Sequence, residues 1–336
     1  MAIPLLIIHI KLIFFVKTIL KYLKMKNLIF KNGDKLPQLG LGTWLSKPNE
    51  VYTAVIEAIK CGYRHIDCAY IYGNEKEIGD ALRFAFSSGL VKREDLFVTS
   101  KLWNSDHAPE RVEAALRKTL SDLQLDYLDL YLMHWPIAFK TGYEQAKTAE
   151  HLVSLDELPL ELTWKAMEQV QKTGLTRHIG VSNFNIPKLK KLIEASQTAP
   201  EVNQIELHPF FIQNELVSFC KTNNILVTAY SPLGSRHLIK TETGIQNSEL
   251  IKSLAGKYHC SETQLILAWG IERGTAVIPK SVNPERIRSN FGALTIALSE
   301  DDIAQIDRLD KQNRIAKGLF AVLPGGSYTY ESIWNE

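Results

Sequence analysis

A regular alternation constrains the fold of this chain more than any other feature of the sequence. Short apolar runs typical of β-strands are separated by longer stretches with helical periodicity. The runs predict eight strands, at residues 39–42, 65–67, 97–101, 127–134, 178–182, 202–206, 226–231 and 276–280. The stretches between them carry apolar residues at three- and four-residue spacing and predict helices at 50–59, 76–86, 109–120, 160–172, 187–195, 214–222, 248–258 and 284–290. Eight such β/α units predict an α/β fold closed as a (β/α)8 TIM barrel.

The composition is that of an ordinary globular protein. The 336 residues are 45% hydrophobic and 23% charged, and a barrel of roughly 250 residues with insertions fits this length. The formal net charge is +2 and the basic residues form no stripe, so no nucleic-acid partner is expected. Cys61, Cys68, Cys220 and Cys260 include no pair at CxxC spacing. We therefore expect reduced thiols, no metal site and a cytosolic protein.

The N-terminal segment, residues 1–24, is set apart from the rest of the chain. It is nearly all apolar but contains His9, Lys11 and Lys17, which makes it a poor signal peptide and a short, marginal membrane span. Two alternatives stay open, a weak membrane anchor and a start codon upstream of the true one. The second places the domain at 25–336. Within it, the Asn32-Gly33 turn predicts a β-hairpin that caps the barrel floor.

Polar side chains follow three of the predicted strands. Asp67 ends one run, Lys101 ends the next, and His134 follows the fourth, while Tyr72 lies just beyond Asp67. The carboxyl ends of parallel strands meet on one face of a barrel, so these four residues are expected to share a pocket. An ammonium group lowers the pKa of a neighbouring phenol, an aspartate holds the lysine, and a histidine donates to an adjacent oxygen. Such a pocket can protonate an alkoxide as it forms.

Other reaction types lack their sequence signals. The chain contains no GxSxG nucleophile motif and no HExxH motif, and Gly40-Leu41-Gly42 lacks the third glycine of a Rossmann fingerprint. A nucleotide would need another site, for which Lys280, Ser281 and Arg286 near a predicted helix N-terminus are suited to phosphate. The long connections 135–159 and 317–336 are expected to rim the pocket mouth.

Several stretches resemble the aldo-keto reductases, in particular the NADPH-dependent aldehyde reductases. The resemblance extends from about Met25 to the C-terminus. The stretches that carry it are GLGTW at 40–44, GYRHIDCAYIYGNE at 62–75, KLWN at 101–104, LDLYLMHWP at 128–136, GVSNF at 180–184 and IPKS at 278–281.

The resemblance implies a role for each matching residue. Tyr72 matches the general acid, Lys101 and Asp67 the pair that tunes it, and His134 the residue that orients the carbonyl. Implied cofactor contacts are Thr43, Asp67, Ser182, Asn183 and Gln204 near the nicotinamide, Tyr230 stacked on it, Ser231, Leu233 and Ser235 at the pyrophosphate, Lys280, Ser281 and Arg286 at the 2′-phosphate, and Asn290 at the adenine. Implied substrate contacts are Trp44, Tyr72, Trp103, His134 and Trp135.

Taken together, these residues predict a monomeric barrel that transfers a hydride from NADPH to an aldehyde, in an apolar pocket suited to aromatic or medium-chain substrates. Ser289 departs from the pattern, because many relatives have glutamate or glutamine beside the adenine-contacting asparagine. The loop 234–244 is shorter than in animal aldehyde reductases, and the tail 323–328 differs from theirs. The alternative is an NADPH-binding sensor or regulatory subunit on the same scaffold, which only the N-terminal apolar segment favours.

Overall fold

The computed structural model describes residues 26–235 and 244–335, and eight parallel strands form its central sheet. The spatial order is β12-β11-β10-β9-β6-β5-β4-β3. All eight predicted strands are present, at β3 (Leu41–Gly42), β4 (His65–Asp67), β5 (Phe97–Leu102), β6 (Leu128–Met133), β9 (Thr176–Ser182), β10 (Val202–Glu206), β11 (Leu226–Tyr230) and β12 (Ala276–Val277). Residues 1–24 and most of the loop 234–244 lie outside the described residues.

The first and last strands meet and close the barrel. Parallel bridges join Leu39 to Val277 and Gly42 to Lys280, and the Gly40 amide donates to the Val277 carbonyl at 2.9 Å. A Cβ at Gly42 would lie 2.7 Å from the carbonyl oxygen of Ile278. The glycine at this position therefore permits the close approach of the two strands at the seam.

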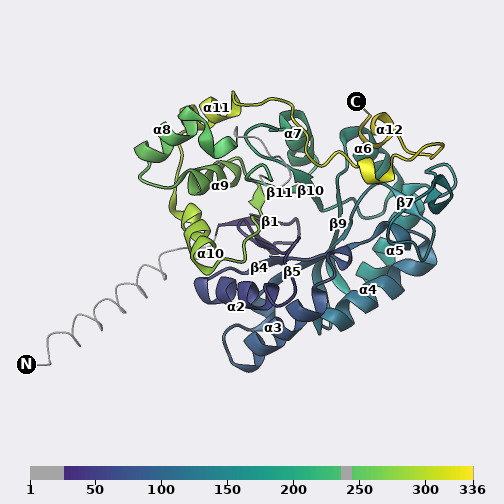
Figure 1. Ribbon diagram of the computed structural model, residues 1–336. Coiled ribbons are helices and arrows are strands. Elements are labelled where there is room, and N and C mark those ends of the chain that lie inside the picture. Colours follow the sequence, from purple (N-terminus) through teal and green to yellow (C-terminus); the bar gives the residue numbers. More distant parts are fainter. Residues whose placement is uncertain (1–25, 236–243, 336) are drawn as a thin grey trace, which may run out of the picture.

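An outer layer of helices surrounds the barrel (Figure 1). The eight predicted helices are α2 (Val51–Cys61), α3 (Glu75–Ser87), α4 (Pro109–Leu123), α5 (Leu160–Lys172), α6 (Ile186–Ala195), α7 (Asn214–Thr222), α8 (Glu249–Lys257) and α10 (Pro284–Phe291). Three further helices were not predicted: α9 (Glu262–Glu272), α11 (Glu300–Asp307) and α12 (Tyr330–Trp334). Every residue of α9 from Leu265 to Ile271 is buried, so this helix has little of the polar face on which the predictions relied.

A β-hairpin closes the floor of the barrel, as predicted. Strands β1 (Asn27–Ile29) and β2 (Lys35–Pro37) pair in antiparallel register across a turn in which Gly33 has φ +88°. Phe30, at the end of β1, packs with barrel-interior residues that include Leu130 and Leu132. Its ring stacks on the His178 ring with 3.7 Å between centroids.

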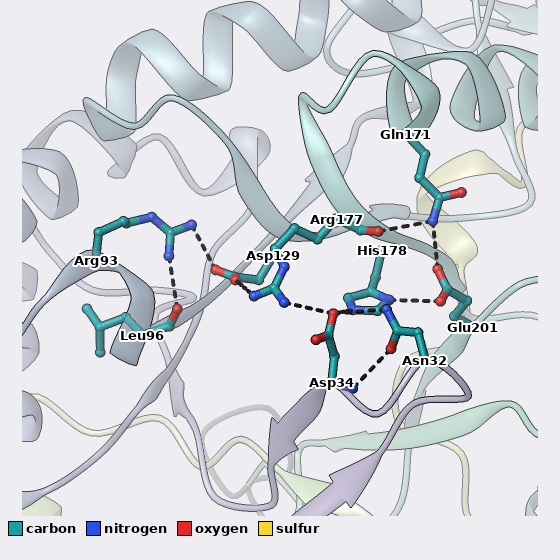
Figure 2. A network of polar contacts seen from close by, with 9 residues as sticks. All are labelled: Asn32, Asp34, Arg93, Leu96, Asp129, Gln171, Arg177, His178 and Glu201. Atoms are coloured by element: carbon teal, nitrogen blue, oxygen red, sulfur yellow. Dashed lines mark hydrogen bonds and ion pairs between the residues drawn. The ribbon is translucent and has the colours of Figure 1, made fainter.

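Charged side chains fasten this hairpin to the barrel (Figure 2). Asp34 accepts from Arg177 at 2.7 Å and from His178 Nε2 at 3.0 Å. The other nitrogen of His178 lies 2.8 Å from Glu201, and Arg177 also contacts Asp129 at 3.3 Å. The carboxylates of Asp34, Asp129 and Glu201 each accept hydrogen bonds from at least two donors within this network.

The long connection and the C-terminal tail pack together over the opposite end. The connection forms a small hairpin of β7 (Ala138–Phe139) and β8 (Leu152–Val153). The Tyr328 hydroxyl of the tail accepts from the Ala138 amide at 2.8 Å. Helix α12 lies beside α6 (Figure 1), where Lys188 donates to the carbonyl of Ile333 at 2.8 Å.

Candidate active site

The four polar residues predicted to share a pocket come together at the carboxyl ends of the strands. Asp67 is the last residue of β4, Lys101 lies near the end of β5, and His134 follows β6 directly. Tyr72 lies on the short 3-10 helix η1 (Tyr70–Tyr72) that leaves β4. The Lys101 ammonium contacts Asp67 Oδ1 at 2.6 Å and the Tyr72 hydroxyl at 3.3 Å.

The ammonium group of Lys101 makes the Tyr72 oxygen a hydrogen-bond acceptor. It donates to Asp67, to Tyr72 and to the carbonyl oxygen of Cys68 at 2.7 Å. A lysine ammonium has three donors and no acceptor, so these contacts satisfy it and the Tyr72 oxygen must act as acceptor. The hydroxyl proton of Tyr72 is therefore left for another partner. The His134 ring lies edge-on to the Tyr72 ring, with 5.9 Å between centroids.

Burial governs the protonation of these groups. It raises the pKa of Tyr72 above its ordinary value and outweighs the opposing effect of Lys101. The sequence predicted the lowering by Lys101 but not the net direction, which depends on how deeply the hydroxyl is buried. For Lys101, burial acts to lower the pKa, but Asp67 and Tyr72 overcome it and the net pKa is raised. Burial, Lys101 and His107 place the pKa of His134 well below its ordinary value. Tyr72 is thus a neutral donor beside a neutral histidine.

The residues predicted at the nicotinamide line the adjacent strand ends. Ser182 ends β9, Asn183 follows it, and Gln204 lies within β10; all three side chains are buried. Asn183 accepts from the Tyr230 hydroxyl at 2.6 Å, and Gln204 donates to Asp67 Oδ2 at 2.7 Å. These amides and hydroxyls form a polar surface that suits a carboxamide. Gln204 connects this surface to Asp67 and so to the group of Asp67, Tyr72, Lys101 and His134. Thr43 donates to the Asp67 carbonyl at 2.8 Å, so it also belongs to this cluster.

The remaining predicted cofactor residues lie farther along the same end of the barrel. Ser231 and Ser235 bond to each other at 2.6 Å across a turn that contains Leu233, and both have positive φ. Lys280 is exposed after β12, and Arg286 is exposed in the first turn of α10. Two exposed cations at a helix N-terminus fit a phosphate group. Ser281 lies between these cations in the sequence, and Asn290 is buried near the end of α10.

Aromatic rings form the walls beside His134. Trp103 and Trp135 are almost buried, whereas Trp44 is 40% exposed. The sequence did not identify Phe139 and Phe320 as part of this wall. Phe320, from the tail, lies 5.1 Å from Trp135 and 6.0 Å from Trp103 between ring centroids. The prediction that both long segments rim the mouth pointed to this region, but not to these rings.

A backbone contact holds the long connection over the wall. The Trp103 indole donates to the Glu144 carbonyl at 2.7 Å, and the Tyr70 hydroxyl donates to the Glu144 carboxylate at 2.6 Å. Neither Tyr70 nor Glu144 was predicted from the sequence, because the interaction joins residues 74 positions apart.

Residues 26–235 and 244–335 contain neither a metal-ligand cluster nor a membrane-spanning helix. No group of three or more His, Cys, Asp or Glu residues there is arranged to hold a metal ion. None of the helices in these ranges has the length and apolar character needed to cross a bilayer. All four cysteines lie in these ranges and are free thiols.

Comparisons with known proteins agree with this geometry. Residues 38–311 match the model of the aldo/keto reductase family. An aldo/keto reductase of Synechocystis sp. is 46% identical over 93% of this chain and 97% of its own length. Aldo-keto reductase family 1 member A1 of Mus musculus is 45% identical over 88% of this chain and 93% of its own.

Two solved structures share the fold. The aldose reductase of Schistosoma japonicum superposes with a TM-score of 0.82 at 39% identity, covering 88% of this chain and 96% of that one. A Bombyx mori aldo-keto reductase in complex with NADP superposes with a TM-score of 0.80 at 37% identity, covering 87% of this chain and 95% of that one.

Proposed function

Because this chain belongs to the aldo/keto reductase family and is therefore an oxidoreductase, we propose that it reduces aldehydes to alcohols with NADPH. One observation carries the proposal. The Lys101 ammonium is fully used as a donor, and its contact with the Tyr72 oxygen leaves the Tyr72 proton free to be given to a substrate. The ring of the neutral His134 lies edge-on to the Tyr72 ring, with 5.9 Å between centroids. This arrangement suits protonation of a carbonyl oxygen.

Each of the four residues has a distinct part in the proposed reaction. Bound NADPH supplies the hydride that reaches the carbonyl carbon. Tyr72 gives its proton to the carbonyl oxygen, and Lys101 stabilises the negative charge that then forms on the tyrosine oxygen. Asp67 holds Lys101 in place through the 2.6 Å ion pair. His134 donates a hydrogen bond that orients the carbonyl oxygen toward Tyr72.

The residues that would hold NADPH fit its charge and polarity. Ser182, Asn183 and Gln204 present buried amides and a hydroxyl toward the nicotinamide end. Lys280 and Arg286 present exposed cations for the 2′-phosphate that distinguishes NADPH from NADH. Thr43, Tyr230, Ser231, Leu233, Ser235, Ser281 and Asn290 complete the set that we propose for the cofactor.

The pocket walls favour an apolar substrate. Four aromatic rings pack together beside His134, those of Trp103, Trp135, Phe139 and Phe320. Trp44, in the stretch 40–44, is exposed. Aromatic walls bind planar or alkyl groups through apolar contact. We therefore propose aromatic and medium-chain aldehydes as substrates. A monomeric state and a cytosolic location stay predictions.

A panel of neutral aromatic, aliphatic and carboxylated aldehydes tests the proposal, with NADPH and NADH each followed by loss of absorbance. Consumption of NADPH with the aromatic and medium-chain members is the expected result. Tight NADPH binding, measured by quenching of tryptophan fluorescence, without turnover of any aldehyde would contradict the proposal. That outcome would favour an NADPH-binding sensor instead.

A further inference from the structure

Five buried polar atoms without partners belong to His134 and to the turn that follows Trp103, its ring neighbour. They are Nδ1 of His134, both ring nitrogens of His107, and both amide atoms of Asn104, and none has a hydrogen-bond partner among the described residues. Asn104 is 0% exposed and His107 is 1% exposed. A buried polar atom that is left unpaired costs about 1–3 kcal/mol, so five in one region call for a shared partner.

These side chains belong to one place in the fold. The His134 amide donates to the carbonyl of Leu102 at 3.1 Å, which places His134 beside the end of β5. The chain then passes through Trp103, whose ring is 5.2 Å from the His134 ring, into the short helix η3 (Asn104–Asp106). His107 ends this turn, and a proton on it would lower the pKa of His134. The turn is fixed from outside, because Thr163 donates to the His107 carbonyl at 2.7 Å.

The chemistry of a neutral imidazole requires a donor at this position. Burial keeps both His134 and His107 uncharged, with the pKa of His107 lowered to about 3. A neutral imidazole has one donor and one acceptor nitrogen. If Nε2 of His134 carries the proton that orients a carbonyl, Nδ1 must accept a hydrogen bond. Asn104 and His107 together offer three N–H groups for such a network.

We propose that Asn104, His107 and Nδ1 of His134 enclose one water molecule, and that this water donates to Nδ1. It thereby holds His134 in the tautomer that has its proton on Nε2. No direct hydrogen bond joins Nδ1 of His134 to Asn104 or to His107. Buried waters make about three hydrogen bonds to groups that otherwise lack partners, so one water can pair with one atom from each of the three side chains. Asn104 and His107 are then positioning residues, and their effect on catalysis rests on the proposed function.

Nitrogen NMR of the full chain labelled on its histidines tests the tautomer directly. The His134 signals are identified by their loss in His134→Gln. In the wild type we expect a protonated Nε2 and an unprotonated, hydrogen-bonded Nδ1. A wild-type His134 with its proton on Nδ1 would overturn the proposal. This measurement needs no turnover, so its outcome is separate from the success or failure of the proposed aldehyde reduction.

Variants of the turn test the two positioning residues. His107→Phe and Asn104→Leu keep the volume but remove the hydrogen bonds, and we expect a mixture of His134 tautomers with a fall of about tenfold in kcat/KM for an aldehyde. The Kd for NADPH should stay within about twofold, because His134 is not among the proposed cofactor contacts. His107→Gln keeps both a donor and an acceptor and should restore the single tautomer.

Ser105→Ala is the matched control, since Ser105 lies in the same turn but its hydroxyl already bonds Asp106 at 3.1 Å. It should leave the tautomer and kcat/KM unchanged. An unaltered His134 spectrum in both His107→Phe and Asn104→Leu would contradict the proposal, as would an equal loss in the control. If the apolar variants do not fold, the wild-type spectrum together with His107→Gln decides the question.

Discussion

The two ends of the barrel both hold buried charges, but they use them differently. At the floor, the Asp129 side chain is 2% exposed and accepts from Arg93, Arg177 and the Val98 amide, so both of its carboxylate oxygens are bonded. Figure 2 shows the contacts with Arg93 and Arg177. At the mouth, Lys101 is equally buried and equally saturated, yet its partner Tyr72 keeps a proton with no protein acceptor among the described residues. Closed networks stabilise the fold, whereas a network that leaves one proton free can do chemistry.

Removal of the Tyr72 proton should have the largest effect on catalysis. Tyr72→Phe deletes the hydroxyl and leaves the ring, so we expect aldehyde reduction to fall by about 10²-fold or more while NADPH still binds. Steady-state kinetics and a fluorescence titration measure the two effects. Tyr70→Phe is the matched control, because its hydroxyl bonds Glu144 at the rim instead of Lys101. Near-normal turnover in Tyr72→Phe would show that another group is the acid.

A substitution in the floor network should lower the stability of the protein without changing its catalytic activity. Asp129→Ala leaves the buried Val98 amide without its acceptor and Arg93 and Arg177 without a shared carboxylate. We expect the free energy of unfolding to fall by roughly 3 kcal/mol, with kcat and NADPH affinity unchanged at temperatures where the variant is folded. Denaturant titration measures the loss. Glu113→Ala, which breaks the exposed Arg117 pair, should change stability by less than about 1 kcal/mol.

A loss of activity in folded Asp129→Ala, with its stability unchanged, would contradict the division between the two ends of the barrel.

The cations proposed for the cofactor site, Lys280 and Arg286, are exposed, in contrast to the buried Lys101. Arg286→Ala should weaken NADPH binding by roughly 10- to 100-fold and leave NADH binding nearly unchanged, since only NADPH has a 2′-phosphate. Fluorescence titration with both cofactors measures this. Arg288→Ala is the matched control on the same helix, because Arg288 pairs with Glu57. Equal weakening in both variants would point to the overall charge of α10 and not to a specific phosphate contact.

The smallest expected effect is a pH dependence at the floor. Burial acts to raise the pKa of Asp34, but Asn32, His178 and Arg177 outweigh it, and the net pKa lies below its ordinary value of 3.8. A carboxylate with a lowered folded pKa contributes stability that is complete above its unfolded pKa and is lost as the pH falls through the folded one. We therefore expect the wild type to lose stability below about pH 4 more steeply than Asp34→Asn. Parallel acid-unfolding curves for the two proteins would refute this.

Much of the mouth could be predicted from the sequence because its residues occupy equivalent positions in successive β/α units. Asp67 and Lys101 lie at the ends of their strands and His134 follows one, so parallel topology alone brings them together. The rim could not be predicted in the same way. Phe320 reaches Trp135 from a tail that has no regular period, and no local pattern joins two segments so far apart.

The outer layer shows the same limit. Amphipathic helices such as α3 were evident from their spacing, whereas α9 was missed because its sequence is apolar on almost every side. A helix enclosed by neighbours on all faces needs no polar stripe, and only the presence of those neighbours explains its composition. Residues 284–290 were predicted as a helix from their apolar spacing, and in the structure Pro284 begins α10 and Asn283 caps it.

The barrel, its hairpin floor and the four polar residues at its mouth follow from the sequence, since all of these depend on periodicity and strand order. The protonation of those residues and the contacts that support them follow from packing in three dimensions. Lys101 acts to lower the pKa of Tyr72, yet burial by surrounding elements raises it overall. Likewise, the unpaired atoms of Asn104 and His107 become meaningful only where packing encloses them beside His134. The effect of desolvation on a pKa depends on all the atoms that surround the group in space, so it cannot be predicted from any one stretch of sequence.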